Sequence, residues 1–278
     1  MNKIKFFLIL TTIILHNEIS AQISHNGEDC INKTFQVVAH VAVDSTMREP
    51  LYTQDTIEMI LSEASTFFER ICFSYRLCEY HVLENDYTLG IIRSQPVSTE
   101  KRLTELRNRF SMRRRINIYF LESIEGIDCG VGTYQGISTL LDANVFLERK
   151  CEEGLAQQLA HQLGHVFGLL DTYNVDEIEL ADGTNCTTAA DRLCSTPADP
   201  FNQDYLSPQD SVRLLTQELV TDFVVDCTFV YELRDPNDDF YSPQVGNIMS
   251  GYPCKCFFTK EQLLLMVKNY KESEIKHF

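Results

Sequence analysis

The chain has 278 residues and an acidic balance, with 40 Asp and Glu against 24 Lys and Arg and a formal net charge of −16. This balance argues against a nucleic-acid-binding protein, which needs a basic surface to meet phosphates. The length suits one large domain or two packed subdomains with a substantial core, and the sequence contains no internal repeat or low-complexity tract.

The first 21 residues predict a secretory signal peptide. Residues 1–5 carry two lysines, residues 6–15 form a short apolar run, and Ala21 ends the segment with a small side chain. This order of charged, apolar and cleavable regions is typical of such a peptide. The run is about half of the ~20 residues that span a bilayer. We therefore expect a mature chain of residues 22–278 that is secreted, or periplasmic in a bacterium, with no membrane association after cleavage.

The mature sequence predicts strands and helices first and a loop-rich half afterwards. Alternating or β-branched stretches indicate strands, and apolar residues at helical spacing indicate helices. The strands are expected at 35–43, 72–82 and 116–121, with an irregular edge strand within 131–146, and the helices at 53–70, 101–110, 152–170, near 207–219 and at 259–276. This order of elements favours the α+β class.

The ten cysteines all follow the expected cleavage site. An even number of cysteines in an exported chain favours disulfides over free thiols. Connectivity does not follow from spacing alone. We expect mutual pairing mostly within the five that follow the histidine-containing helix, at positions 186, 194, 227, 254 and 256.

The segment LAHQLGHVFGLLD, residues 159–171, predicts a metal site. His161 and His165 are four residues apart, so on a helix both rings project from one face and can hold one zinc ion. Gly168 can adopt a positive φ and end the helix, which lets the chain turn back so that Asp171 supplies a third ligand. A fourth position then stays open for water, as a catalytic zinc site requires. Two histidines at this spacing also occur without metal, and the added glycine and acid are what favour a site.

A second motif, NIMSGY at residues 247–252, places Met249 in a turn well downstream. Together the two motifs resemble the metzincin zinc proteases, whose long zinc motif is followed by a Met-turn. The loops at 183–200, 226–230 and 247–262 look like those of the pappalysin-type branch, which includes secreted bacterial members. The resemblance runs from about residue 35 to the C-terminus and is strongest from Leu159 onward.

The resemblance implies a metzincin-like two-lobed zinc-protease domain. Its upper lobe, about residues 35–170, would hold a twisted mixed sheet and the active-site helix, and its lower lobe, about 171–278, would be irregular and tied by disulfides. A peptide or protein would bind in the cleft between them, paired to an edge strand. By position, the resemblance makes His161, His165 and Asp171 the zinc ligands and Met249 the apolar floor beneath the metal. The oligomeric state is not predicted.

Three positions depart from the family's pattern. In a zinc peptidase a glutamate after the first histidine takes the proton of the metal-activated water, and Gln162 stands there with an amide that is no base near neutral pH. Gly251 replaces a tyrosine that helps stabilise the oxyanion in relatives, and Tyr252 would need a shifted backbone to take over. Ser195 replaces an aspartate, and a calcium ion that such an aspartate would help to hold is therefore in doubt.

Three hypotheses follow from the sequence. The first is a zinc-bound pseudoprotease that keeps the cleft for binding peptide or protein. The second is an active zinc-dependent metalloendopeptidase that uses a substitute base. The third is a metal-free secreted binding or structural protein, in which the histidines bind nothing.

Overall fold

The computed structural model describes residues 30–44, 46, 48–83, 99–124, 130–132, 143–149, 154–173, 177–201, 224–273 and 276. The expected signal peptide and the helix expected near 207–219 lie outside these residues, as do Cys129 and Cys151. In the described part of the chain, no helix combines the length and the apolar character needed to cross a bilayer.

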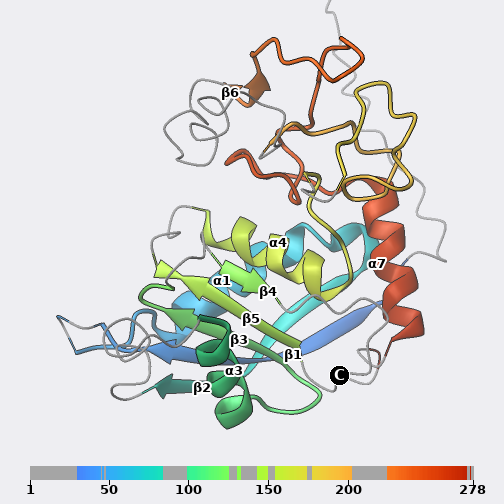
Figure 1. Cartoon of the computed structure of the whole chain (residues 1–278). Helices are drawn as coiled ribbons and strands as arrows, with labels where there is room; N and C mark the ends of the chain where they lie inside the picture. The colour runs from blue at the N-terminus through green and yellow to red at the C-terminus, as the bar shows by residue number, and fades with distance from the viewer. Residues whose placement is uncertain are drawn as a thin grey trace, which may run out of the picture.

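A five-stranded mixed sheet forms the base of the molecule (Figure 1). Its order is β2-β1-β3-β5-β4; β1, β2, β3 and β5 run parallel, and β4 is antiparallel to β5. The strands are β1 (Lys33–Ala42), β2 (Phe73–Leu83), β3 (Ile116–Leu121), β4 (Gly130–Gly132) and β5 (Ala143–Glu148). The twisted mixed sheet expected from the sequence is thus present, within a mixed α/β arrangement.

The single edge strand expected within residues 131–146 is two separate strands. β4 is the edge, but β5 lies inside the sheet between β3 and β4, and all six of its residues are buried. A strand buried on both faces shows no alternation of polar and apolar residues, which is the pattern that would have distinguished it from its irregular neighbour.

Helices cover both faces of the sheet. α1 (Gln54–Thr66), α4 (Leu155–Val166) and α7 (Lys260–Glu272) share one apolar core with the sheet, and α3 (Thr99–Phe110) packs with the other face. A short 3₁₀ turn, η1 (Glu69–Ile71), joins α1 to β2. Thr53 caps α1, and Thr259 caps α7 in a capping box with Gln262. These side chains satisfy backbone N–H groups that the first helical turn leaves without partners.

Phe35 lies at the centre of the larger core. Its ring is fully buried, and its centroid lies 5.1 Å from Phe73, 5.7 Å from Tyr75, 5.2 Å from Phe167 and 5.8 Å from Tyr270. These partners belong to β2, the end of α4 and α7. One aromatic side chain of β1 therefore joins the sheet to the helix that carries both histidines.

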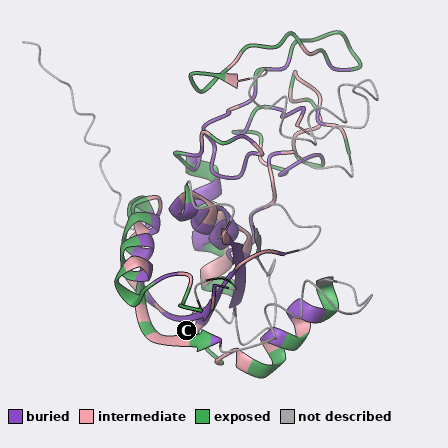
Figure 2. Cartoon of the chain, turned by 90° about the vertical axis from the view of Figure 1, so that its left-hand side faces the viewer, coloured by how far each residue is buried: buried purple, intermediate pink, exposed green. Residues whose placement is uncertain are grey.

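The described residues between α4 and α7 are mostly irregular, and they lie on the far side of α4 from the sheet (Figure 1). They contain one small hairpin, β6 (Val224–Val225) with β7 (Thr228–Phe229). Buried residues follow α4 and the sheet beneath it, whereas these loops are exposed along much of their length (Figure 2). Loops with so little core of their own need other constraints.

Disulfides supply those constraints. Cys186 pairs with Cys194 and Cys227 with Cys254, which confirms the expected pairing among these cysteines. Cys256 keeps an exposed free thiol. A third bond joins Cys30 to Cys72 and ties the start of the described chain to the start of β2.

We expect Phe35→Ala to lower the free energy of unfolding by ~3–5 kcal/mol, because it opens a cavity among four aromatic rings. Urea unfolding followed by circular dichroism measures this change. Met59→Ala on α1 is the matched control, because its side chain is 69% exposed and its removal should change stability by about 0.5 kcal/mol or less. Equal losses in both variants would contradict the place given to Phe35.

Candidate metal centre

The C-terminal end of α4 sets the direction of the chain that follows it. Gly168 has a φ of 87°, its N–H donates to the carbonyl of His165, and the N–H of Leu169 donates to the carbonyl of Gly164. This pair of bonds is the Schellman motif, which favours glycine because other residues are strained at positive φ. The helix therefore ends at Val166, and the chain turns back so that Asp171 lies beside both histidines.

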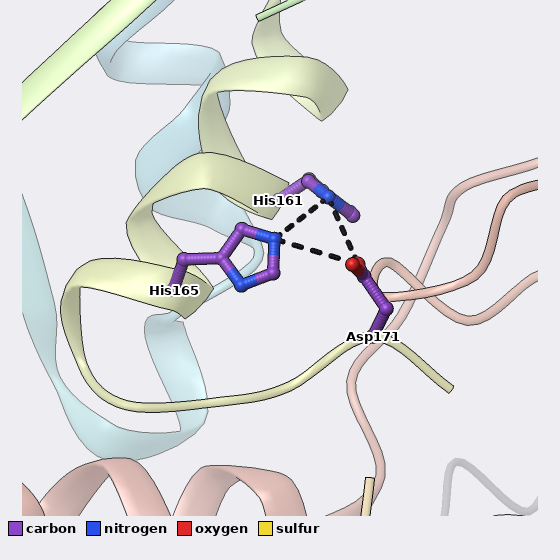
Figure 3. Close-up of side chains that lie close together, drawn as sticks. All are labelled: His161, His165 and Asp171. Atoms are coloured by element: carbon purple, nitrogen blue, oxygen red, sulfur yellow. Dashed lines mark hydrogen bonds and ion pairs between the residues drawn. The ribbon is translucent and has the colours of Figure 1, made fainter. Parts of the chain in front are cut away.

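His161, His165 and Asp171 point toward one another from α4 and the segment that follows it (Figure 3). The two Nε2 atoms are 3.1 Å apart, and Oδ1 of Asp171 lies 3.3 Å from Nε2 of His161 and 3.4 Å from Nε2 of His165. Ligands ~2.05 Å from a tetrahedral zinc ion would lie ~3.3 Å from each other. The three atoms thus occupy three corners of a tetrahedron of zinc dimensions.

The other nitrogen of each ring faces a backbone carbonyl. Nδ1 of His161 lies 2.8 Å from the carbonyl oxygen of Ile248, and Nδ1 of His165 lies 2.9 Å from that of Leu169. Since a carbonyl only accepts, a hydrogen bond to it requires the proton on Nδ1, and this tautomer leaves the Nε2 lone pair for a metal. When both rings are neutral in this tautomer, two lone pairs and one carboxylate oxygen converge on one point. The donor set fits a divalent cation, and its nitrogen and oxygen atoms are ligands that zinc accepts.

Burial and charge act together on these three groups. Burial, with the charge of Lys255 beside it, holds the pKa of His161 well below its ordinary value, so the ring is neutral. Burial also lowers the pKa of His165, but the hydrogen bond and the charge of Asp171 outweigh it and the pKa is raised. The same contacts lower the pKa of Asp171 against the opposing effect of burial. A metal must therefore displace a proton that His165 and Asp171 share.

Met249 packs directly beneath the helix, in the turn formed by residues 247–250. A Cβ atom on Gly164 would lie 2.5 Å from the Met249 sulfur, so the thioether occupies the space beside the glycine. Met249 is fully buried, and its carbonyl accepts from the N–H of Thr172, next to Asp171. The turn therefore contacts both the helix, at Gly164, and the segment that carries the third candidate ligand, and the floor role of Met249 stays a prediction.

Tyr252 belongs to a hydrogen-bonded group around Asp199. Its hydroxyl donates to Oδ1 of Asp199 at 3.1 Å, and the hydroxyl of Thr172 donates to Oδ2 at 2.6 Å. Tyr252 and Asp199 are both buried, and burial raises the pKa of the Asp199 carboxyl. An oxyanion role for Tyr252 stays a prediction, and it would require the hydroxyl to leave Asp199.

Lys255 is a buried cation that the sequence did not single out. Its ammonium donates to the carbonyls of Ile248, at 3.0 Å, and Ser250, and Nζ lies 3.3 Å from Nδ1 of His161. Burial lowers its pKa to about 8, against the attraction of the Asp171 and Asp199 carboxylates. Its position between two cysteines gave no signal of burial.

Gln162 is buried on α4 beside His161.

Among the residues that the structure describes, His161, His165 and Asp171 form the one group of His, Cys, Asp or Glu side chains whose atoms lie close enough to share an ion. The described cavity of about 490 Å³ lies elsewhere, between the first turns of α1 and α4. It therefore belongs to the opposite end of α4 from His165.

Gly251 is covered by an aromatic ring. A Cβ atom built there would lie 2.4 Å from two ring carbons of Phe201. The Phe201 ring is itself held edge-on against Tyr173 and Tyr252, with centroids 4.7 and 5.3 Å away. The absence of a side chain at position 251 is therefore matched by the presence of the ring at position 201. A tyrosine at 251 would need Phe201 to move.

No protein-family model and no curated protein matches this chain. Among solved structures, metalloproteinase-II from Bacteroides fragilis is similar at 12% identity and a TM-score of 0.31, over 68% of this chain and 54% of that one. Archaemetzincin from Methanopyrus kandleri is similar at 16% identity and a TM-score of 0.31, over 66% of this chain and 96% of that one. This chain thus spans about half of the Bacteroides protein. Similarity at this level assigns neither a family nor an activity.

We expect Gly251→Ala to destabilise the protein by ~1–3 kcal/mol, because the added methyl group overpacks against Phe201. In a Phe201→Ala background the same change should cost much less, since the space is then open. Denaturant unfolding of the two single variants and the double variant measures this coupling. Strictly additive costs would show that Phe201 does not hold the space over Gly251.

Proposed function

We propose that this chain is a secreted, pappalysin-like zinc-binding protein that holds peptide near the metal but has lost or greatly weakened peptide-bond hydrolysis. The observation that carries the proposal is the convergence of Nε2 of His161, Nε2 of His165 and Oδ1 of Asp171 at tetrahedral spacing. The backbone carbonyls behind both rings support it, because they orient the nitrogens toward a shared ion.

His161, His165 and Asp171 would hold the zinc ion, which when bound polarises a carbonyl and lowers the pKa of a water. Hydrolysis also needs a group that takes the water's proton and returns it to the leaving amine, which is typically worth ~10²–10⁴ in rate. Gln162 occupies the position next to His161 where the sequence pattern has that base. Its amide donates and accepts hydrogen bonds but does not take up a proton.

The position where the family pattern has an oxyanion-stabilising tyrosine also differs in this chain. Phe201 fills the space over Gly251, where the family pattern has a tyrosine, and the Tyr252 hydroxyl is engaged by Asp199. Two parts of the catalytic machinery are therefore replaced while the metal ligands are kept. This combination favours binding over turnover.

A peptide would bind along the outer edge of β4. Among the described residues this strand is the last of the sheet, it is antiparallel to β5, and α4 packs against both. An extended peptide can pair with such an edge through backbone hydrogen bonds and pass over the helix that carries the metal ligands. The competing hypothesis, an active endopeptidase with a substitute base, draws on the same ligand set and differs only in turnover.

We expect one zinc ion per purified chain and its loss in His161→Ala, because two remaining ligands hold zinc poorly. Elemental analysis after exhaustive dialysis measures this. His81→Ala is the matched control, because His81 is a half-exposed histidine of β2 that pairs with Glu79. A wild-type protein without zinc, or zinc retained by His161→Ala, would favour the metal-free hypothesis.

We expect Gln162→Glu to cleave a mixed peptide library faster than wild type by up to ~10²–10⁴, since it restores a base beside the zinc. Mass spectrometry of the products measures this, with zinc content determined on both proteins. Gln158→Glu adds the same charge one helical turn earlier and should leave cleavage unchanged. Chelator-sensitive cleavage by wild type at the rate of Gln162→Glu would establish the active endopeptidase instead.

A further inference from the structure

Lys255 is fixed in place behind the candidate metal centre. Its segment pairs with the turn that carries Met249, through N–H of Ile248 to the carbonyl of Phe257 at 2.7 Å and N–H of Cys256 to the carbonyl of Gly246 at 2.8 Å. The disulfide from Cys254 to Cys227 anchors the same segment. The lysine side chain is buried, so its ammonium cannot move out to water without disturbing these contacts.

The ammonium of Lys255 has three N–H groups and no lone pair. Two of them are taken by the carbonyls of Ile248 and Ser250. The third is left for Nδ1 of His161, 3.3 Å away. This contact is a hydrogen bond only when Nδ1 carries a lone pair.

His161 therefore faces two partners with opposite demands on one nitrogen. The carbonyl of Ile248 requires a proton on Nδ1, which frees Nε2 for metal. Lys255 requires the proton to be on Nε2, from which it can be donated to Oδ1 of Asp171 at 3.3 Å. In the second arrangement the Ile248 carbonyl still accepts from Lys255, and the proton on Nε2 of His161 occupies the position that a metal would take. Nδ1 of His165 faces the carbonyl of Leu169, which favours the tautomer with Nε2 free.

The charge of Lys255 also opposes zinc binding, as the tautomer with the proton on Nε2 does. The Asp171 and Asp199 carboxylates attract the ammonium of Lys255, so the metal-free centre is internally compensated. A zinc ion brings two positive charges close to this buried ammonium, and Gln162 adds no negative charge beside them. Repulsion between like charges is strong in such a weakly polarisable environment.

We propose that Lys255 acts as a built-in competitor of the metal: it stabilises the tautomer of His161 that cannot bind zinc through Nε2 and so makes the centre one that releases and regains its ion. This inference rests on the zinc site proposed above. It makes metal occupancy, rather than proteolysis, the variable property of the site. The zinc-bound and zinc-free forms would then differ in net charge at the place where peptide binds.

Zinc affinity of the full mature chain, measured by competition with a chromophoric chelator, tests the proposal. We expect Lys255→Gln, which keeps amide donors and removes the charge, to bind zinc about 10- to 100-fold more tightly than wild type, the range over which groups behind metal ligands change affinity. Lys260→Gln is the matched control, because Lys260 is an exposed lysine at the start of α7 and should leave the affinity unchanged. Equal or weaker binding by Lys255→Gln overturns the proposal.

Nitrogen-15 NMR of the histidine rings gives a second readout that needs no variant. In the metal-free wild type the proton of His161 should reside on Nε2, and zinc should move it to Nδ1. A proton on Nδ1 in the metal-free protein overturns the role of Lys255, even where Lys255→Gln fails to fold. If neither wild type nor Lys255→Gln binds zinc, the zinc site itself is wrong, and this result is distinct from equal affinities.

Discussion

The contact between Nδ1 of His161 and the carbonyl of Ile248 joins two segments that are 87 residues apart. It orients a candidate ligand on α4 and at the same time fixes the turn beneath that helix. Met249 completes the junction by packing its sulfur against Gly164, where any larger residue would push it away. A shift of the His161 ring would therefore move the turn, and a shift of the turn would move Met249.

Because the turn contacts the candidate ligands, the groups that stabilise the turn would also act on a bound metal. Lys255 is the clearest case, since its ammonium binds the same carbonyl that His161 needs. Asp199 is another, because it holds Thr172 beside Asp171 and Tyr252 beyond the turn. Zinc with Asp171 leaves one net positive charge at the ligands, and Lys255 adds a second. A site with a glutamate beside the first histidine would offset that charge, whereas Gln162 does not.

Local patterns in the sequence predicted much of the fold. Residues 116–121 are a strand with those bounds, and the apolar spine of α4 is buried as its spacing indicated. The candidate ligands were also accessible to sequence reasoning, since i, i+4 spacing and a helix-ending glycine are short-range properties. The strand of residues 143–148 was misplaced because a fully buried strand carries no alternating signal. Its position depends on which strands pair, and pairing is a long-range property.

Lys255 and Phe201 were missed from the sequence because their roles depend on long-range contacts. Nothing near Lys255 in the chain indicates that it is buried, and a lysine is ordinarily a surface residue. Gly251 was singled out from the sequence, but Phe201, 50 positions earlier, was not, because only their contact shows that the ring takes the space of the absent side chain. The candidate ligands can thus be predicted from one helix and the turn that follows it, whereas the chemistry of such a site also depends on side chains from distant parts of the chain. Under the proposed function, Gln162 and Gly251, in place of the glutamate and tyrosine of the family pattern, would separate metal binding from catalysis. Binding needs only the three convergent atoms, whereas turnover needs the groups around them.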